Sequence, residues 1–142
     1  MNQIRQLNIV RAPGFTLIEL MIALAIISII VAIVLPLIQS YFIKAQHASA
    51  IEEIMAGKTS MEISFYQELT VTTPDEVNLQ NASKVCSSIT AVNNLAAGTG
   101  RIQCTITGAS AINGAVVTLD RTSSGLWHCS STAPAQYTAN CR

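Results

Sequence analysis

The feature that most constrains this chain is an apolar run near its start. The 24 residues from Phe15 to Ile38 contain a single ionisable side chain, Glu19. As a helix these residues would rise about 36 Å, which exceeds the ~30 Å hydrocarbon core of a bilayer. A carboxylate near the centre of a membrane costs on the order of 2.5 kcal/mol or more, so Glu19 requires a specific explanation.

The residues at the start of the run, GFTLIE (residues 14–19), form a recognisable motif. They follow a short leader with two arginines and no acidic residue, which places the leader in the cytoplasm under the positive-inside rule. The motif resembles the prepilin peptidase site of type IV pilins. The resemblance implies that the leader is cut after Gly14, that Phe15 becomes the N-methylated first residue, and that Glu19 stands fifth in the mature chain. The motif is shared by major pilins, minor pilins and the pseudopilins of type II secretion.

We expect one long helix from Phe15 to about Tyr66. No glycine occurs in residues 15–56, and Pro36 is the one breaker, which should kink or loosen the helix locally. A proline at this point also matches the pilin pattern, in which the segment before it can stretch or melt in the filament. Beyond residue 41, polar side chains alternate with apolar ones. The apolar residues share a helical spacing and predict a face that packs under a sheet: Ile51, Ile54, Met61, Phe65 and Leu69.

The C-terminal part of the chain predicts a small antiparallel sheet. Alternating or β-branched segments at residues 101–107, 115–121 and 125–130 are strand candidates, and turn residues separate them. We interpret residues 74–100 as the connection between helix and sheet, with room for one short helical or strand piece near residues 84–92. A fourth strand is expected but not placed. The predicted fold class is therefore α+β, with the amphipathic half of a long N-terminal helix packed under the sheet.

Charge and composition exclude several function classes. Without the two arginines of the leader, the mature chain has six basic and eight acidic side chains, a net charge of −2. It therefore lacks the clustered lysines and arginines of a nucleic-acid-binding surface. No serine or cysteine has a plausible catalytic base, and no phosphate-binding loop or paired-carboxylate site is present, so we predict neither enzyme activity nor a cofactor. His47 and His128 lack metal-ligand spacing, and we interpret His47 as a surface residue of the helix.

Four cysteines, all in the C-terminal part, point to disulfides. An even number of cysteines in a small, membrane-anchored head is typical of proteins that fold outside the cytoplasm. Metal binding is the competing interpretation, but the sequence contains no C-x-x-C. Four cysteines allow three connectivities. The residues concerned are Cys86, Cys104, Cys129 and Cys141.

A second resemblance lies near the C-terminus. The segments GAVVTLDRT (residues 114–122) and GLWHC (residues 125–129), with Tyr137 and the closing Cys-Arg, resemble the last strands of Pseudomonas-type major pilins. In those proteins the last two cysteines close the D-loop, a disulfide-bounded loop at the exposed edge of the subunit. The resemblance implies a Cys129–Cys141 bridge, which the spacing also favours, and leaves Cys86–Cys104 as the second bridge. Residues 130–140 contain no charged residue, so a charged receptor-binding loop is not implied.

Together the two resemblances imply a structural subunit of a type IV pilus. They divide the chain into a leader (residues 1–14), an apolar helix (residues 15–42) and a head (residues 43–142). The apolar helix would span the inner membrane before assembly and form the filament core afterwards, while the head moves from the periplasm to an extracellular fibre. In the fibre, Glu19 would pair with the charged amine of Phe15 in a neighbouring subunit. Pro36 is the third residue expected to matter for assembly.

The implied partners are other copies of the chain, prepilin peptidase, the inner membrane, and an assembly platform with assembly and retraction ATPases. The fibre would serve adhesion and twitching motility, and DNA uptake is a further option that the few positive charges of the head support weakly. Three alternatives remain open. Two are a minor pilin that acts as a DNA receptor and a pseudopilin of a type II secretion system, and the third is a single-span membrane protein with a binding head, which would keep its leader uncut. Pseudopilin heads commonly use a calcium site in place of the disulfide-closed end, and no dense Asp/Asn cluster occurs near this C-terminus.

Overall fold

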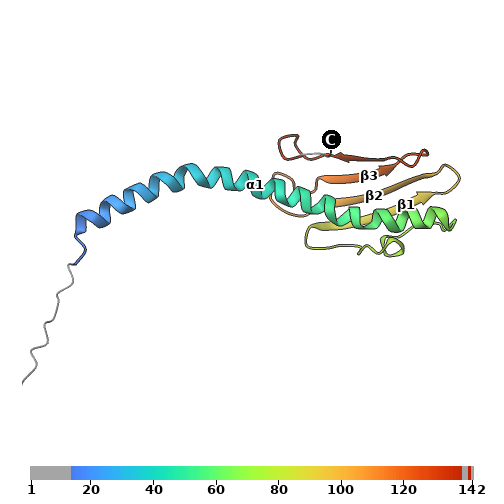
Figure 1. The fold of residues 1–142 in the computed structure, drawn as a ribbon, viewed down its shortest axis with the longest axis horizontal. Coiled ribbons are helices and arrows are strands. Elements are labelled where there is room, and N and C mark those ends of the chain that lie inside the picture. Colours follow the sequence, from blue (N-terminus) through green and yellow to red (C-terminus); the bar gives the residue numbers. More distant parts are fainter. Residues whose placement is uncertain (1–13, 139–140, 142) are drawn as a thin grey trace, which may run out of the picture. The chain divides into compact units, whose positions relative to one another are not determined.

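The computed structural model describes residues 14–138 and residue 141. It contains one long helix and a four-stranded antiparallel sheet, the α+β class predicted from the sequence (Figure 1). Neighbouring strands in the sheet follow the order of the sequence. The described residues divide into two compact units, with the boundary between Leu37 and Ile38. The elements are α1 (Leu17–Tyr66), the 3-10 helix η1 (Pro74–Val77), β1 (Cys86–Asn94), β2 (Thr99–Ile106), β3 (Val116–Arg121) and β4 (Trp127–Ser131).

The first half of α1 is exposed on all sides within the subunit. None of residues 14–39 is buried, although most of them are large and apolar. Among the described residues, α1 is the one helix long and apolar enough to cross a membrane. Pro36 lies inside α1, and the helix continues past it without a break. Because proline has no N–H, the helix loses one hydrogen bond at this position.

The second half of α1 buries a stripe along one side. The buried residues are spaced alternately by three and four, so they lie on one helical face: His47, Ala50, Ile54, Gly57, Met61 and Ser64. The sequence prediction is confirmed for Ile54 and Met61, but Leu69 lies beyond the helix and is exposed. The prediction that His47 is a surface residue is wrong, because His47 is only 1% exposed. Four of the six buried positions carry small or polar side chains, which an apolar pattern does not reveal.

Gly57 shows why a small residue is needed on this face. A Cβ atom at this position would lie 2.5 Å from Cδ1 and 2.8 Å from Cγ of Leu79. Leu79, in the connection between α1 and β1, is itself buried. The glycine therefore lets the connection pack directly on the helix backbone, a close approach that any larger side chain would block.

The sheet has one strand more than the three that the sequence places. β1 is the fourth strand that the sequence did not place, and it lies close to residues 84–92, where we allowed a short helical or strand piece. The interpretation of the rest of this stretch as a connecting loop is wrong from Asn93, because β1 continues to Asn94 and β2 begins at Thr99. The strand buries only small or widely spaced side chains, among them Ile89 and Ala91, and polar residues stand between them. A bulge between Cys86 and Ser88 further interrupts the alternation. The other three strands lie within a few residues of their predicted bounds.

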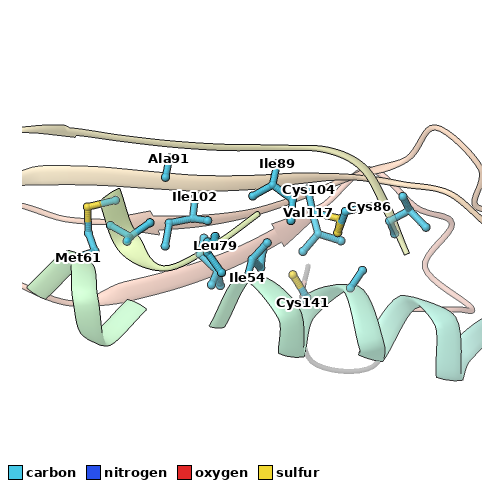
Figure 2. Close-up of a cluster of buried hydrophobic side chains, with 14 of the residues drawn as sticks. Ile54, Met61, Leu79, Cys86, Ile89, Ala91, Ile102, Cys104, Val117 and Cys141 are labelled. Atoms are coloured by element: carbon cyan, nitrogen blue, oxygen red, sulfur yellow. A yellow bond between two sulfur atoms is a disulfide. The ribbon is translucent and has the colours of Figure 1, made fainter. Parts of the chain in front are cut away.

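The core of the head lies between the sheet and the second half of α1. Figure 2 shows Ile54 and Met61 of α1 pointing toward side chains of the sheet, with Leu79 between them. The inward-facing residues of the strands include Ile89, Ala91, Ile102, Cys104 and Val117. The connection that follows α1 also covers the outer edge of β1. Asn81 accepts a hydrogen bond from the backbone of β1 at 2.7 Å, and Val71 accepts another at 3.1 Å, so this sheet edge is not free to pair with another strand.

Candidate processing and assembly site

The motif residues form the first turn of α1 and its cap. The Thr16 hydroxyl donates to Glu19 Oε2 at 2.7 Å, and the Thr16 N–H donates to the same oxygen at 2.9 Å. In return, the Glu19 N–H donates to the Thr16 hydroxyl at 3.3 Å. This reciprocal arrangement is a capping box, which explains why the helix begins at Leu17 and not at Phe15 as predicted. The negative charge of Glu19 also suits the positive end of the helix dipole.

The structure brings some of the predicted site residues together and leaves others apart. Gly14 and Phe15 precede the cap directly, and the Phe15 side chain is 85% exposed. Pro36 lies in the same helix, but 17 residues of α-helix place it about 26 Å from Glu19 along the axis. The motif is therefore one local site, and Pro36 is not part of it. Residues 1–13 of the leader lie outside the described residues.

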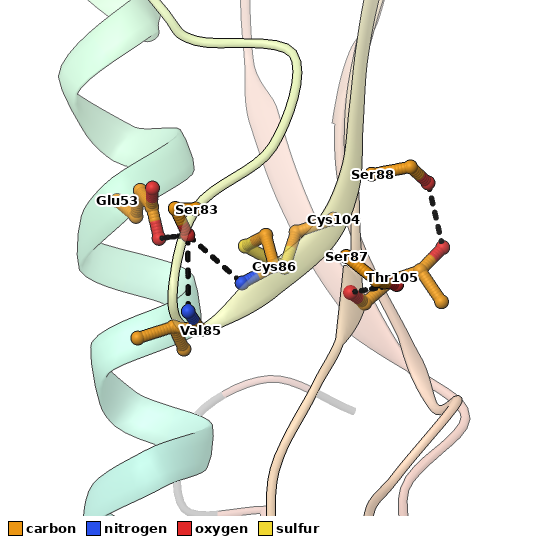
Figure 3. Close-up of a disulfide and its surroundings, with 8 residues drawn as sticks. All are labelled: Glu53, Ser83, Val85, Cys86, Ser87, Ser88, Cys104 and Thr105. Carbon is orange, nitrogen blue, oxygen red and sulfur yellow. Dashed lines mark hydrogen bonds between the residues drawn. A yellow bond between two sulfur atoms is a disulfide. The ribbon is translucent and has the colours of Figure 1, made fainter.

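Two disulfides staple the head. Cys86 bonds to Cys104, and Cys129 bonds to Cys141, which are the two pairs that the resemblance implies. The first bridge joins the neighbouring strands β1 and β2 inside the core (Figure 3). Beside it, the Ser83 hydroxyl accepts the N–H groups of Val85 and Cys86. The same hydroxyl donates to Glu53 of α1 at 2.8 Å, so the start of β1 is tied to the helix.

A polar cluster joins α1 to the other end of the sheet. Arg121 of β3 donates two hydrogen bonds to Glu62 of α1, at 2.8 and 3.0 Å. Trp127 of β4 donates its indole N–H to the same carboxylate at 2.7 Å. The guanidinium of Arg121 also lies 4.2 Å from the ring centre of Phe65. The hydrogen bonds from Arg121 hold the pKa of Glu62 below its usual range, against an opposing effect of burial.

A second polar contact holds the D-loop on α1. His47 Nε2 lies 2.9 Å from the hydroxyl of Ser131, the last residue of β4. Burial lowers the pKa of His47, because a charged imidazolium is disfavoured away from water. Sequence reasoning missed both polar contacts, since their members lie more than 50 positions apart in the chain.

Comparison with known proteins decides the family. Residues 43–142 match the pilins of bacterial filaments, and residues 11–35 match the prokaryotic N-terminal methylation motif. The chain belongs to the type IV pilin family. The pilin is 34% identical to Fimbrial protein Q of Moraxella bovis, a comparison that covers 82% of this chain and 83% of the relative. It is 33% identical to the Type IV major alpha-pilin of the same organism, with the same coverage of both chains. Fimbrial protein EcpC of Eikenella corrodens is 37% identical over 91% of the pilin and 90% of the relative.

Family and fold agree on the general function. The pilin is a structural subunit of fimbriae and not an enzyme. The structure gives this subunit a capped, apolar half-helix and a head with two disulfides. The polar cluster of Glu62, Arg121 and Trp127 lies far from the motif in the sequence and serves to fix the head on its helix.

Proposed function

We propose that this pilin polymerises through the first half of α1 into a surface fibre. The observation that carries the proposal is a helix that exposes apolar side chains on every side and begins directly at the methylation motif. Such a surface is stable in lipid or against copies of itself, but not in water. The fibre serves adhesion and twitching motility, and DNA uptake is a further role open to it.

The proposal divides the chain by function. Residues 1–14 are the leader, which prepilin peptidase removes by cutting between Gly14 and Phe15 before Phe15 is methylated. Residues 15–42 anchor the subunit in the inner membrane and later pack in the filament core. Residues 43–142 form the head. Force for assembly and retraction would come from ATPases on an inner-membrane platform, as the resemblance to type IV pilins implies; this chain itself contains no phosphate-binding loop.

Glu19 gives assembly its direction. Moving the helix from lipid to the filament core exchanges one apolar environment for another, so hydrophobicity alone favours neither state. A carboxylate in lipid is unfavourable, and the charged amine of Phe15 in a neighbouring subunit would relieve that cost. Both bonds from Thr16 end on Oε2 of Glu19. Within the described residues Oε1 accepts no hydrogen bond, so this oxygen is available to the neighbour's amine.

Two substitutions of Glu19 separate its charge from its capping role. Glu19→Gln keeps a side chain that can complete the capping box, whereas Glu19→Ala removes the cap as well. We expect both variants to be inserted and cleaved normally, and both to yield at least about tenfold less sheared fibre, the effect of losing 1.4 kcal/mol or more per contact. Thr16→Ala, which weakens the cap alone, is the matched control and should still assemble. Normal fibres from Glu19→Gln would refute the charge-pairing role.

The processing step is tested by the intact mass of protein sheared from the cell surface without reduction. The expected mass is that of residues 15–142, plus one methyl group and minus four hydrogens for two disulfides. A cleaved form that stays in the membrane would favour a minor pilin or a pseudopilin. An uncut form would refute the cleavage between Gly14 and Phe15.

A DNA-receptor role has less support than a fibre role. Arg101 and Arg121 are two of the few cations of the head, and each forms an ion pair, with Asp120 and Glu62 respectively. Their charges are therefore partly neutralised before any phosphate approaches. Salt-dependent binding of DNA to sheared fibres would restore this role.

A further inference from the structure

A groove lies in the head between the second half of α1 and the C-terminal end of the sheet. It measures about 440 Å³, and its floor is apolar, with Ile51 and Met55 from α1, Trp127 from β4, and Tyr137 from the D-loop. Met55 is 48% exposed although it belongs to the head and not to the membrane-spanning half. An apolar hollow on the surface of the head is suited to a partner.

The rim of the groove carries an excess of positive charge. Lys44 and Lys58 of α1 line it, and Glu52 is the one carboxylate among the described residues of its lining. Among the ion pairs of the described residues, neither lysine takes part. Lys58 instead lies 5.7 Å from the ring centre of Trp127, and Lys44 lies 5.9 Å from that of Tyr41. Lys58 also acts electrostatically on Glu62 of its own helix, but neither ammonium group is held in an ion pair, so a carboxylate from outside can approach both.

The same chain offers a segment with the complementary chemistry. Residues 66–70, at the end of α1, are all exposed. Tyr66 and Leu69 expose 87% and 54% of their surfaces, and Glu68 stands between them. Glu68 takes part in no ion pair of the described residues. Two further exposed acids, Asp75 and Glu76, follow in η1. The segment therefore combines apolar side chains with negative charge, as the groove requires.

We propose that, in the fibre, the groove of one subunit receives Tyr66 to Leu69 of a second copy. The groove is lined by α1 residues on both sides of Ile51, and 15 residues of α-helix place Tyr66 about 23 Å further along the same axis. A contact between two different surfaces of the same chain is heterologous, so it repeats without closing and builds a helical array. The inference rests on the proposed fibre and adds a contact between heads to the packing of the apolar helices.

Photo-crosslinking tests the contact in assembled fibres. Tyr66 is replaced by p-benzoylphenylalanine, whose ketone inserts into nearby C–H bonds on illumination, in cells that also make the unaltered pilin. We expect covalent dimers in sheared fibres, with the cross-link at residues 51–58 or at Trp127 of the second chain. The same probe at Val92, which is 47% exposed on β1, should give no such product. Fibres that contain the Tyr66 probe but cross-link elsewhere, or not at all, would overturn the contact.

A charge swap provides the second test. In the proposed contact, Lys58 of one subunit lies against Glu68 of the second copy. Lys58→Glu sets two carboxylates against each other there, and it also removes a positive charge that acts on Glu62 of its own helix. We expect it to lower the yield of sheared fibre by about fivefold or more. Combining it with Glu68→Lys should restore the yield to within about twofold, because the pair is re-formed in reverse. Lys84→Glu changes the charge by the same amount away from the groove and is the control. A double variant that stays as poor as Lys58→Glu would contradict the pairing. If the unaltered pilin itself yields no fibre, the proposed function is wrong. If it yields normal fibres but Glu68→Lys does not restore the yield of Lys58→Glu, only the groove contact is rejected.

Discussion

The two halves of α1 differ in opposite directions in apolar content and in burial within the subunit. The first half is apolar throughout, yet none of its residues is buried in the subunit. The second half is far more polar, yet it buries six residues against the head, His47 and Gly57 among them. The burial in the subunit is therefore the reverse of what apolar content alone would suggest, because the partners of the first half are other molecules.

This contrast shows that the two halves depend on different kinds of complementarity. The first half needs only an apolar environment, which lipid or neighbouring helices can equally supply. The second half needs shape and specific hydrogen bonds, since small and polar side chains are buried without cost only where the partner fits them. A substitution that has little effect in the first half should therefore destabilise the head when it is made at a buried position of the second half.

The largest expected difference between the two halves is in the effect of replacing an isoleucine by alanine. Ile54 is fully buried in the head, and Ile54→Ala should lower the free energy of unfolding of the head by about 2–5 kcal/mol through lost burial and a residual cavity. Ile30, in the first half, is 55% exposed, so Ile30→Ala should leave the head unchanged. Urea unfolding of the full chain in detergent micelles, followed by the fluorescence of the single tryptophan, measures both. Equal losses would mean that the halves are not independent.

Gly57 sharpens the comparison by its fit to Leu79. Alanine is the better helix former by about 1 kcal/mol, but overpacking in a core costs about 1–3 kcal/mol. Because the added Cβ would lie 2.5 Å from Leu79, we expect Gly57→Ala to destabilise the head by about 1 kcal/mol net. The same change in a Leu79→Ala background should be neutral or stabilising. Unfolding curves of the unaltered protein, the two single variants and the double variant measure both effects. The packing argument would be refuted if Gly57→Ala were equally destabilising with Leu79 and with alanine at that position.

Glu62 links the second half to the sheet through charge. In the folded state the pKa of Glu62 lies below its ordinary value. Its contribution to the free energy of unfolding is therefore fully present above the unfolded pKa and is lost as pH falls through the folded pKa. Glu62→Gln should lower the free energy of unfolding by about 1–2 kcal/mol at pH 7 and reduce the loss of stability below about pH 4. Urea midpoints at pH 7 and pH 3 test both parts. If the free energy of unfolding of Glu62→Gln fell as steeply with pH as that of the unaltered protein, the loss of stability in acid would belong to other carboxylates.

His47 should give the smallest effect, in a different pH range. Burial lowers its pKa, so the neutral form is favoured in the folded state and stability declines as pH falls below about 6.5. We expect a loss of no more than about 1 kcal/mol between pH 7 and pH 5.5, which His47→Gln should flatten. His128→Gln, at an exposed position, is the control and should keep the slope. A slope that persists in His47→Gln would refute this assignment.

Much of the fold could be predicted because its causes are local. The first part of α1 follows from an uninterrupted apolar run and the absence of glycine in residues 15–56, and its continuation follows from the helical spacing of later apolar residues. Three strands follow from alternation between turn residues. The type and bounds of β1 could not be decided from the sequence, since its inward residues are small or widely spaced and a bulge breaks their period. The motif of Gly14, Phe15 and Glu19 is likewise contiguous, so it could be identified without the structure. The capping box was not predicted, although its Thr-x-x-Glu pattern is a known signature of a helix start.

The sequence by itself thus determined the long helix, the site at its start, and the four cysteines from which the bridges form. Only the tertiary structure decided that His47 is buried against Ser131, that Gly57 makes room for Leu79, and that Glu62 meets Arg121 and Trp127. Apolar periodicity and helix capping can be predicted because they depend on residues a few positions apart. A buried polar side chain, or a glycine in a packed face, can be explained only by the partner that folding places beside it.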